Sequence, residues 1–256
     1  NKNDLVKTYF AFREFKIVDK KFYLNDKPIF LNGLLDQGYF SDGIYTPASY
    51  EAYLYDILKM KELGFNTLRK HIKVEPQMFY YLADKLGMLV MQDFPNSGKY
   101  SFIKDTALPT IGFKKINDKN RSVSSVRRSH FLDSGTKLIN LLYKHPSVVY
   151  YTIFNEGWGQ FSSDEMYEFF KDKDTTRVFD STSGWFWQKK SDVDSLHVYF
   201  KKVKLPKHSD RPIVLSEFGG YSLKIKDHVF NTEQNYGYKL FDTKESLTKA
   251  IVTLYE

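Results

Sequence analysis

The chain has 256 residues, of which 42% are hydrophobic and 27% charged, so it is long and apolar enough for one large domain with a proper core. It contains no cysteine, which excludes disulfides and thiolate metal sites, and it has no run of about 20 apolar residues, so neither a spanning helix nor a membrane partner is expected. The net charge of +7 arises from lysines scattered among acidic residues, which favours a solvated surface over a nucleic-acid partner. The start, NKNDLVKTYF, contains neither Met nor an apolar signal segment and is typical of the interior of a longer protein.

The first elements predicted along the chain are β-hairpins. In REFKIVDKKFYLNDKPIFLNG, residues 13–33, Phe15 and Ile17 alternate with polar neighbours, and the sequence Asn-Asp-Lys-Pro is a turn signal. From Leu31 onwards the pattern changes to strands that alternate with helices.

This alternation predicts βα units. A helix is predicted over residues 46–64, with Thr46 as its cap, Pro47 as its first residue and Gly64 as its stop, because apolar side chains recur at helical spacing between them. An apolar strand follows, and residues 75–94 repeat the same order of helix, glycine and strand. Two such repeats are typical of a parallel sheet.

A long polar segment, residues 95–122, interrupts the alternation and predicts a loop, which at this length is usually functional or disordered. A helix ending at Lys144 follows. The run VVYYTIFNE, residues 148–156, lacks polar alternation and predicts a strand buried on both faces. A short helix at 164–174, three further strands and a last helix at 244–256 complete the pattern.

The predicted strands number seven, and they start at Leu31, Phe65, Met88, Val148, Arg177, Ser195 and Ile213. We therefore predict an α/β fold, a (β/α)8 TIM barrel truncated before its eighth strand, preceded by a short β-hairpin segment. An open doubly wound sheet is the alternative, but the sequence has no GxGxxG or Walker loop to support it.

In a parallel barrel the active site lies at the carboxyl ends of the strands. The polar and aromatic residues predicted at those ends are Asp36, Arg69, His71, Asp93, Asn155, Glu156, Asp180, Trp185, His197, Tyr199 and Glu217. One polar residue at a strand end is unremarkable, but a concentration at the same end of every strand predicts a binding site.

Two of these carboxylates, Glu156 and Glu217, follow strongly apolar strands. A pair about 5–5.5 Å apart would suit retaining glycoside hydrolysis, in which one carboxyl donates a proton and the other attacks the anomeric carbon. Arg69 and the Tyr199 hydroxyl are suited to hold one of them ionised, and Asn155 to hold a sugar hydroxyl. The aromatic content of 17% fits both a core and a sugar-binding cleft.

Each of these residues also has a structural interpretation. A single strand-end glutamate is more often an ion-pair partner than a catalyst. His71 and His197 lack HxH or HExxH spacing, so polar lining is favoured over metal ligation, and neither a metal nor a cofactor is expected. Trp158 is left open between pocket wall and packing, whereas at least one of Trp185 and Trp187 is expected to face the cleft.

Five segments, ELGFNTLRKHI, ADKLGMLVMQDFP, HPSVVYYTIFNEGWGQ, DSTSGW and PIVLSEFGG, give the chain a resemblance to a known family. From about Phe22 to its end it resembles the catalytic barrel of glycoside hydrolase family 2. The resemblance implies Glu156 as acid/base and Glu217 as nucleophile. Together with the strand-end positions, it gives a predicted substrate-binding set of Asn155, Arg69, His71, Asp36, Tyr199, Trp185 and His197.

The resemblance also implies β-sandwich domains before the barrel. Residues 1–28 are then a hairpin junction with the last of them, and residues 29–256 a catalytic barrel that is incomplete at its C-terminus. The predicted function is a retaining exo-β-glycosidase acting on a carbohydrate, with β-galactosidase as the leading activity. The alternatives are β-glucuronidase, β-mannosidase, an endo-glucanase-like hydrolase and a sugar-binding barrel without catalysis.

Two segments depart from the family pattern and bear on the choice of sugar. Where many β-galactosidases and β-glucuronidases carry Asn-x-His-Glu and Ser-His-Tyr-Pro, this chain has GLLDQG and KHIK. The retaining mechanism is therefore predicted more firmly than the sugar. The cellular compartment and a homo-oligomeric state are left open.

Overall fold

A computed structural model describes residues 4–96, 98, 100–110, 118–119, 121–184, 186–199, 202–229 and 231–256. The chain begins with a small antiparallel sheet made of β1 (Phe15–Val18), β2 (Lys21–Leu24) and β3 (Lys27–Ile29). Both connections are two-residue turns with positive φ, at Asp19 and Lys20 and at Asn25 and Asp26. Such turns match the twist of a hairpin, and Asn and Asp tolerate this conformation well.

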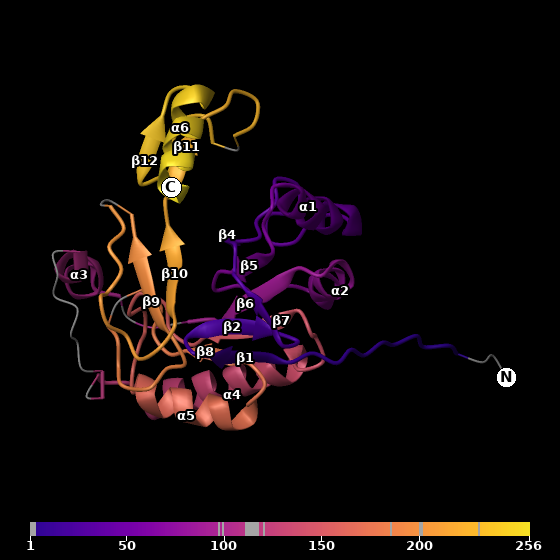
Figure 1. Ribbon diagram of the computed structural model, residues 1–256, viewed down its shortest axis with the longest axis vertical. Coiled ribbons are helices and arrows are strands. Elements are labelled where there is room, and N and C mark those ends of the chain that lie inside the picture. The colour runs from indigo at the N-terminus through magenta and orange to yellow at the C-terminus, as the bar shows by residue number, and fades with distance from the viewer. Residues whose placement is uncertain are drawn as a thin grey trace.

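The main sheet has five parallel strands in sequence order: β4 (Gly33–Asp36), β5 (Thr67–Lys70), β6 (Leu89–Asp93), β7 (Val148–Thr152) and β8 (Val178–Asp180). Every residue of β5 to β8 is buried, because helices cover one face, and the antiparallel sheet, Val193 and Val214 pack on the other side (Figure 1). The helices that connect these strands are α1 (Tyr50–Glu62), α2 (Gln77–Leu86), α4 (Ser125–Leu142) and α5 (Ser163–Lys173).

The remaining strands form two separate parallel pairs: β9 (Asp194–Val198) with β10 (Ile213–Phe218), and β11 (Tyr221–Leu223) with β12 (Lys239–Phe241). Helix α6 (Lys244–Tyr255) ends the chain beside β11 and β12, beyond the tip of β10 (Figure 1). Within the described residues no strand ladder joins β8 to β9 or β10 to β4. The fold is α/β, and its parallel strands do not form a closed barrel in this part of the chain.

Two local predictions were wrong. Helix α1 begins at Tyr50 rather than Pro47, and Ser49, in an extended conformation, is its N-cap. The polar segment predicted as a loop contains a π-helix, η1 (Phe102–Ala107), followed by the short α3 (Leu108–Thr110). The side chain of Ser101 accepts a hydrogen bond from the Lys104 backbone N–H, which caps η1. Among the described residues no helix is long and apolar enough to cross a membrane.

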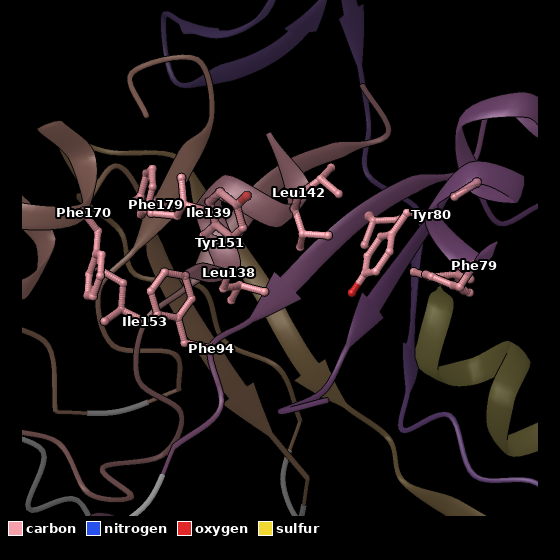
Figure 2. Close-up of a cluster of buried hydrophobic side chains, with 14 of the residues drawn as sticks. Phe79, Tyr80, Phe94, Leu138, Ile139, Leu142, Tyr151, Ile153, Phe170 and Phe179 are labelled. Atoms are coloured by element: carbon pink, nitrogen blue, oxygen red, sulfur yellow. The ribbon is translucent and has the colours of Figure 1, made fainter. Parts of the chain in front are cut away.

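The core between the sheet and its helices combines aliphatic side chains with many aromatic rings (Figure 2). Phe94, directly after β6, contacts Phe170 of α5 with ring centroids 4.8 Å apart in an edge-to-face arrangement. Gly135 of α4 faces this pair, and a Cβ there would lie 2.5 Å from Phe170 and 2.7 Å from Phe94. The helix can approach the two rings this closely only because position 135 has no side chain.

We therefore expect Gly135→Ala to destabilise the chain. The better helix propensity of Ala is worth about 1 kcal/mol, but overpacking a buried site costs about 1–3 kcal/mol. Urea denaturation measures the change in the free energy of unfolding. Ser134→Ala, at an exposed position of the same helix, is the control and should not destabilise. A Gly135→Ala chain as stable as the wild type would contradict this account of the packing.

Candidate active site

A buried guanidinium connects the ends of several parallel strands. Arg69 of β5 donates to both carboxylate oxygens of Asp93 through Nε and Nη2, each at 3.0 Å. It also donates at 2.8 Å to Glu217 Oε1 and at 2.8 Å to Asn155 Oδ1. All four side chains are buried. Charge-assisted bonds of this kind are the strong ones, so Arg69 fixes the relative positions of two carboxylates and an amide.

Local sequence explains why these groups meet. Successive side chains of a strand point to opposite faces, so Arg69 and Lys70 point in opposite directions from β5. Asp93 is the last residue of β6, and Asn155 lies just beyond β7, where it forms a parallel bridge with Ser183. The carboxyl ends of parallel strands thus deliver Arg69, Asp93 and Asn155 to one place.

Glu217 of β10 is surrounded by positive and hydrogen-bonding groups. Besides Arg69, the Tyr199 hydroxyl donates to its Oε2, and ring nitrogens of His197 and His71 lie 3.4 and 3.9 Å from Oε1. Burial alone would raise the pKa of this carboxyl. The charges of His197, Arg69 and His71 and the Tyr199 hydrogen bond outweigh that effect, so the pKa of Glu217 lies below its usual value. Glu217 is therefore held ionised.

Glu156 is the second carboxylate of the site and has different surroundings. Its backbone N–H donates to Ser183 O at 2.9 Å, and its Oε1 lies 2.8 Å from His197 Nδ1. The side chain is 19% exposed, against 6% for Glu217. Carboxylate oxygens of Glu156 and Glu217 lie within 4.8 Å of each other. Glu217 is thus buried beside the Arg69 guanidinium, whereas Glu156 is partly exposed.

His197 lies between the two glutamates. Its Nδ1 is close to Glu156, whereas its Nε2 lies 3.4 Å from Glu217 and 3.0 Å from Ser183 Oγ. The ring packs against Gly184, where a Cβ would lie 2.6 Å from Nδ1. The imidazole therefore contacts both carboxylates.

Glu156, His197 and Glu217 are also residue types that bind metals, and their donor atoms lie within 4.8 Å of one another. Arg69 lies 2.8 Å from Glu217, however, and a second cation there would meet its charge. These residues therefore fit a metal poorly, and the absence of a metal from the chemistry stays a prediction.

Most of the predicted substrate-binding residues lie in this cluster, and Asp36 does not. His71 joins it through Asp93, with Nδ1 3.0 Å from Oδ2. Asp36 lies elsewhere: its carboxylate accepts from Lys70 Nζ at 2.9 Å, and Lys70 also pairs with the buried Glu75 at 2.6 Å. The prediction that Asp36 lies in the same site as Arg69 was wrong. Trp185 lies outside the described residues.

Two residues of this cluster, Asp93 and Tyr238, were not among the predicted catalytic and substrate-binding residues. Asp93 appeared among the strand ends but was assigned no role, although Arg69 and His71 hold the pKa of this buried carboxyl below its usual value against the effect of burial. Tyr238 gave no signal at all. Its ring stacks on Tyr199 with centroids 3.9 Å apart and planes at 22°, so it supports the tyrosine that bonds Glu217.

Replacing Arg69 by Met should destabilise the chain by about 3–5 kcal/mol, because Asp93 and Glu217 would remain buried without their cation. Urea denaturation measures the loss. The control is Arg128→Met, which breaks a more exposed ion pair with Glu165 and should cost no more than about 1 kcal/mol. Equal losses in the two variants would mean that Arg69 does not have the structural role assigned to it.

Comparisons with known proteins show what the chain is similar to. A β-galactosidase of Priestia megaterium is 23% identical over 216 residues, which cover 81% of this chain and 20% of that protein. A β-glucuronidase of Streptococcus agalactiae is 25% identical over 155 residues, covering 60% of this chain and 24% of that protein. The chain thus spans about a fifth to a quarter of the length of these relatives.

Solved structures show the same fold. A β-D-glucuronidase of Dictyoglomus thermophilum superposes with a TM-score of 0.68 at 17% identity, covering 96% of this chain and 45% of that chain. β-Glucuronidase 3 of Bacteroides uniformis gives a TM-score of 0.57 at 21% identity, over 74% of this chain and 23% of that one. Residues 15–227 match the family described as glycosyl hydrolases family 2, TIM barrel domain, and the chain belongs to that family.

Proposed function

We propose that the protein is a retaining exo-β-glycosidase, with β-galactosidase as the leading activity. The observation that carries the proposal is the glutamate pair, whose carboxylate oxygens lie within 4.8 Å with one member held ionised. That spacing suits direct attack by a carboxylate, whereas inversion needs roughly 6.5–9.5 Å to admit a water. β-Glucuronidase is the second candidate, since relatives of both names match the chain, and β-mannosidase remains a further family alternative.

The first step joins the sugar to the protein. Glu156 gives its proton to the glycosidic oxygen while Glu217 attacks the anomeric carbon, so the bond to the leaving group breaks as a bond to Glu217 forms. Glu217 suits the attack because it is ionised, and Glu156 suits the proton transfer because its side chain reaches solvent. The product is a glycosyl ester of Glu217 and a free alcohol.

The second step releases the sugar. A water enters beside Glu156, which takes one of its protons while the oxygen attacks the anomeric carbon and displaces Glu217. Two inversions at the same carbon retain the β configuration. Glu217 regains its charge beside Arg69 and the Tyr199 hydroxyl, whose hydrogen bonds stabilise the departing carboxylate.

Asn155 is suited to hold the sugar. Its Oδ1 accepts from Arg69, which orients the amide so that the NH2 group points away from the guanidinium. No hydrogen bond of Nδ2 occurs among the described residues, so it can donate to a sugar hydroxyl. Because Asn155 precedes Glu156 directly, the hydroxyl that it binds would be close to the reacting carbon, where contacts strengthen in the transition state.

We also propose that the seven strands β4 to β10 are seven of the eight strands of a (β/α)8 barrel, with the eighth strand outside this sequence. In this proposal residues 1–28 are a junction with a preceding β-sandwich domain, and residues 29–256 form the catalytic barrel. In this proposal the eighth strand would lie between β10 and β4, and β8 and β9, which no ladder joins among the described residues, would be neighbours in the closed barrel.

In the full-length protein, Glu156→Ala should lower kcat/KM by about 10²–10⁴-fold for glycosides with poor leaving groups, which need protonation. Dinitrophenyl glycosides need none, so their first step should be nearly spared. Glu217→Gln should lose turnover of both kinds, and the exposed Glu165→Ala is the control that should change neither. Losses that are the same for all leaving groups in Glu156→Ala would contradict its role as acid. A wild type that binds sugars without hydrolysis would favour the non-catalytic barrel.

The pH dependence tests how Glu217 is held ionised. Because its pKa is depressed, activity is present above that pKa and is lost as the pH falls through it. Tyr199→Phe removes one hydrogen bond to the carboxylate, so the pKa rises and the acid limb of kcat/KM should move to higher pH by about one unit. Tyr167→Phe removes a hydroxyl bonded to Asp192 instead and should leave the limb in place. An unmoved limb in Tyr199→Phe would contradict the assignment.

A further inference from the structure

Two exposed aromatic side chains pack against each other, and one of them, Trp158, lies two residues after the proposed proton donor. Trp158 and Tyr100 are 44% and 40% exposed, and their ring centroids lie 4.5 Å apart with planes inclined at 33°. Each ring combines an apolar face with a polar edge. An exposed pair of this kind suits a ligand that is apolar on its face and polar at its rim.

The chain places this pair close to Glu156. The Trp158 backbone N–H donates to Asn155 O at 2.9 Å, which closes a turn over residues 155–158. The Cα atoms at the two ends of such a turn lie within about 7 Å of each other. Phe186 packs against the other side of the turn, where a Cβ on Gly157 would lie 2.3 Å from its ring. Phe186 is buried, so the turn exposes Trp158 and not Phe186.

The partner ring comes from a distant segment that is tied to the same turn. Arg121 donates through Nη1 to Gly157 O at 3.0 Å and through Nη2 to Asp105 Oδ1 at 2.7 Å. The other oxygen of Asp105 accepts from the backbone N–H of Ser101 at 2.8 Å, directly after Tyr100. One guanidinium thus joins the segment carrying Tyr100 to the turn carrying Trp158, which makes the pair a built surface rather than a chance contact.

The proposed reaction indicates which part of the substrate would meet these two rings. In the proposed reaction Glu156 protonates the oxygen of the leaving group, whereas the sugar that is transferred lies against Glu217 and Asn155. The leaving group must therefore extend past Glu156, which is itself part of the 155–158 turn that carries Trp158. Arg121 is engaged by Gly157 O and Asp105, so the surface offers flat apolar faces rather than a cation.

We propose that Trp158 and Tyr100 bind the pyranose ring of the leaving group by stacking on its C–H face. This inference rests on the proposed glycosidase activity. It makes the natural substrate a disaccharide or longer glycoside, with a neutral sugar on the leaving side. Trp158, which the sequence left between packing and pocket wall, becomes a specificity residue.

The test compares two kinds of substrate of the full-length protein that share the transferred sugar. The first is a glycosyl fluoride, whose leaving group has no ring. The second kind comprises the 1,3-, 1,4- and 1,6-linked β-disaccharides with glucose as the leaving group. The transferred sugar is the one that the wild type hydrolyses fastest as a nitrophenyl glycoside. In Trp158→Ala, kcat/KM for the best disaccharide relative to the fluoride should fall about tenfold. Trp158→Tyr keeps a flat face and should recover most of the ratio.

The matched control is Tyr55→Ala, which removes an aromatic side chain that is 62% exposed on α1 and should keep the wild-type ratio. If Trp158→Ala lowers both substrates equally, Trp158 only supports the turn and the proposal fails while the glycosidase assignment stands. An unchanged ratio and unchanged rates would overturn it as well. A wild type that hydrolyses neither substrate would overturn the activity itself, and with it the inference.

Discussion

The structure of the site depends on one buried cation, Arg69. Asp93 and Glu217 are both almost fully buried, and burying a carboxylate without a partner costs several kcal/mol. The Arg69 fork offers a bidentate match to Asp93 and still reaches Glu217 and the Asn155 amide. Lysine could not make these contacts at once, because its ammonium is a point charge without a planar fork. The same contacts that make burial tolerable also keep Glu217 ionised.

Strand geometry gives β5 a second, separate charge cluster. Lys70 follows Arg69 and points to the opposite face, where its ammonium bonds Asp36 and Glu75 and lies 4.8 Å from the Phe79 ring centroid. Asp36 pairs with Lys70 in the β4–β5 register and shares its face. This explains why the structure places Arg69 beside Glu217 and Asp36 outside that cluster, although counting polar residues at strand ends put both in one site. Adjacent residues of a strand face opposite sides, so a strand end alone does not identify the cavity side.

The sequence predicts those parts of the structure that depend on local patterns of apolar residues. The seven predicted strand starts lie within about two residues of β4 to β10. Of these strands, β5 to β8 are buried on both faces, and such strands read as apolar runs in the sequence. Contacts between distant segments have no such local signature. Tyr238 lies 39 positions from Tyr199, in a polar segment, and its backbone bond to Gly220 O is visible only in the fold. The π-helix η1 was not predicted for a related reason, since its Asp105 bonds Arg121, 16 positions further along the chain.

The turn after β7 shows how the fold aims a functional carboxylate. Glu156 has φ of 51° and Gly157 has φ of 75°, and the first value is uncommon for a residue with a Cβ. Holding a non-glycine residue there costs about 1–2 kcal/mol. The hydrogen bonds from Glu156 N–H to Ser183 O and from Arg121 to Gly157 O compensate that cost.

This turn also decides which face of the strand end residue 156 occupies. Had the strand continued without the turn, the alternation of side chains would have carried residue 156 to the face opposite Asn155. The left-handed turn instead keeps Asn155 in contact with Arg69 while the carboxylate of Glu156 reaches His197 and comes within 4.8 Å of Glu217. The local strain is therefore what lets consecutive residues of one strand end serve the same site.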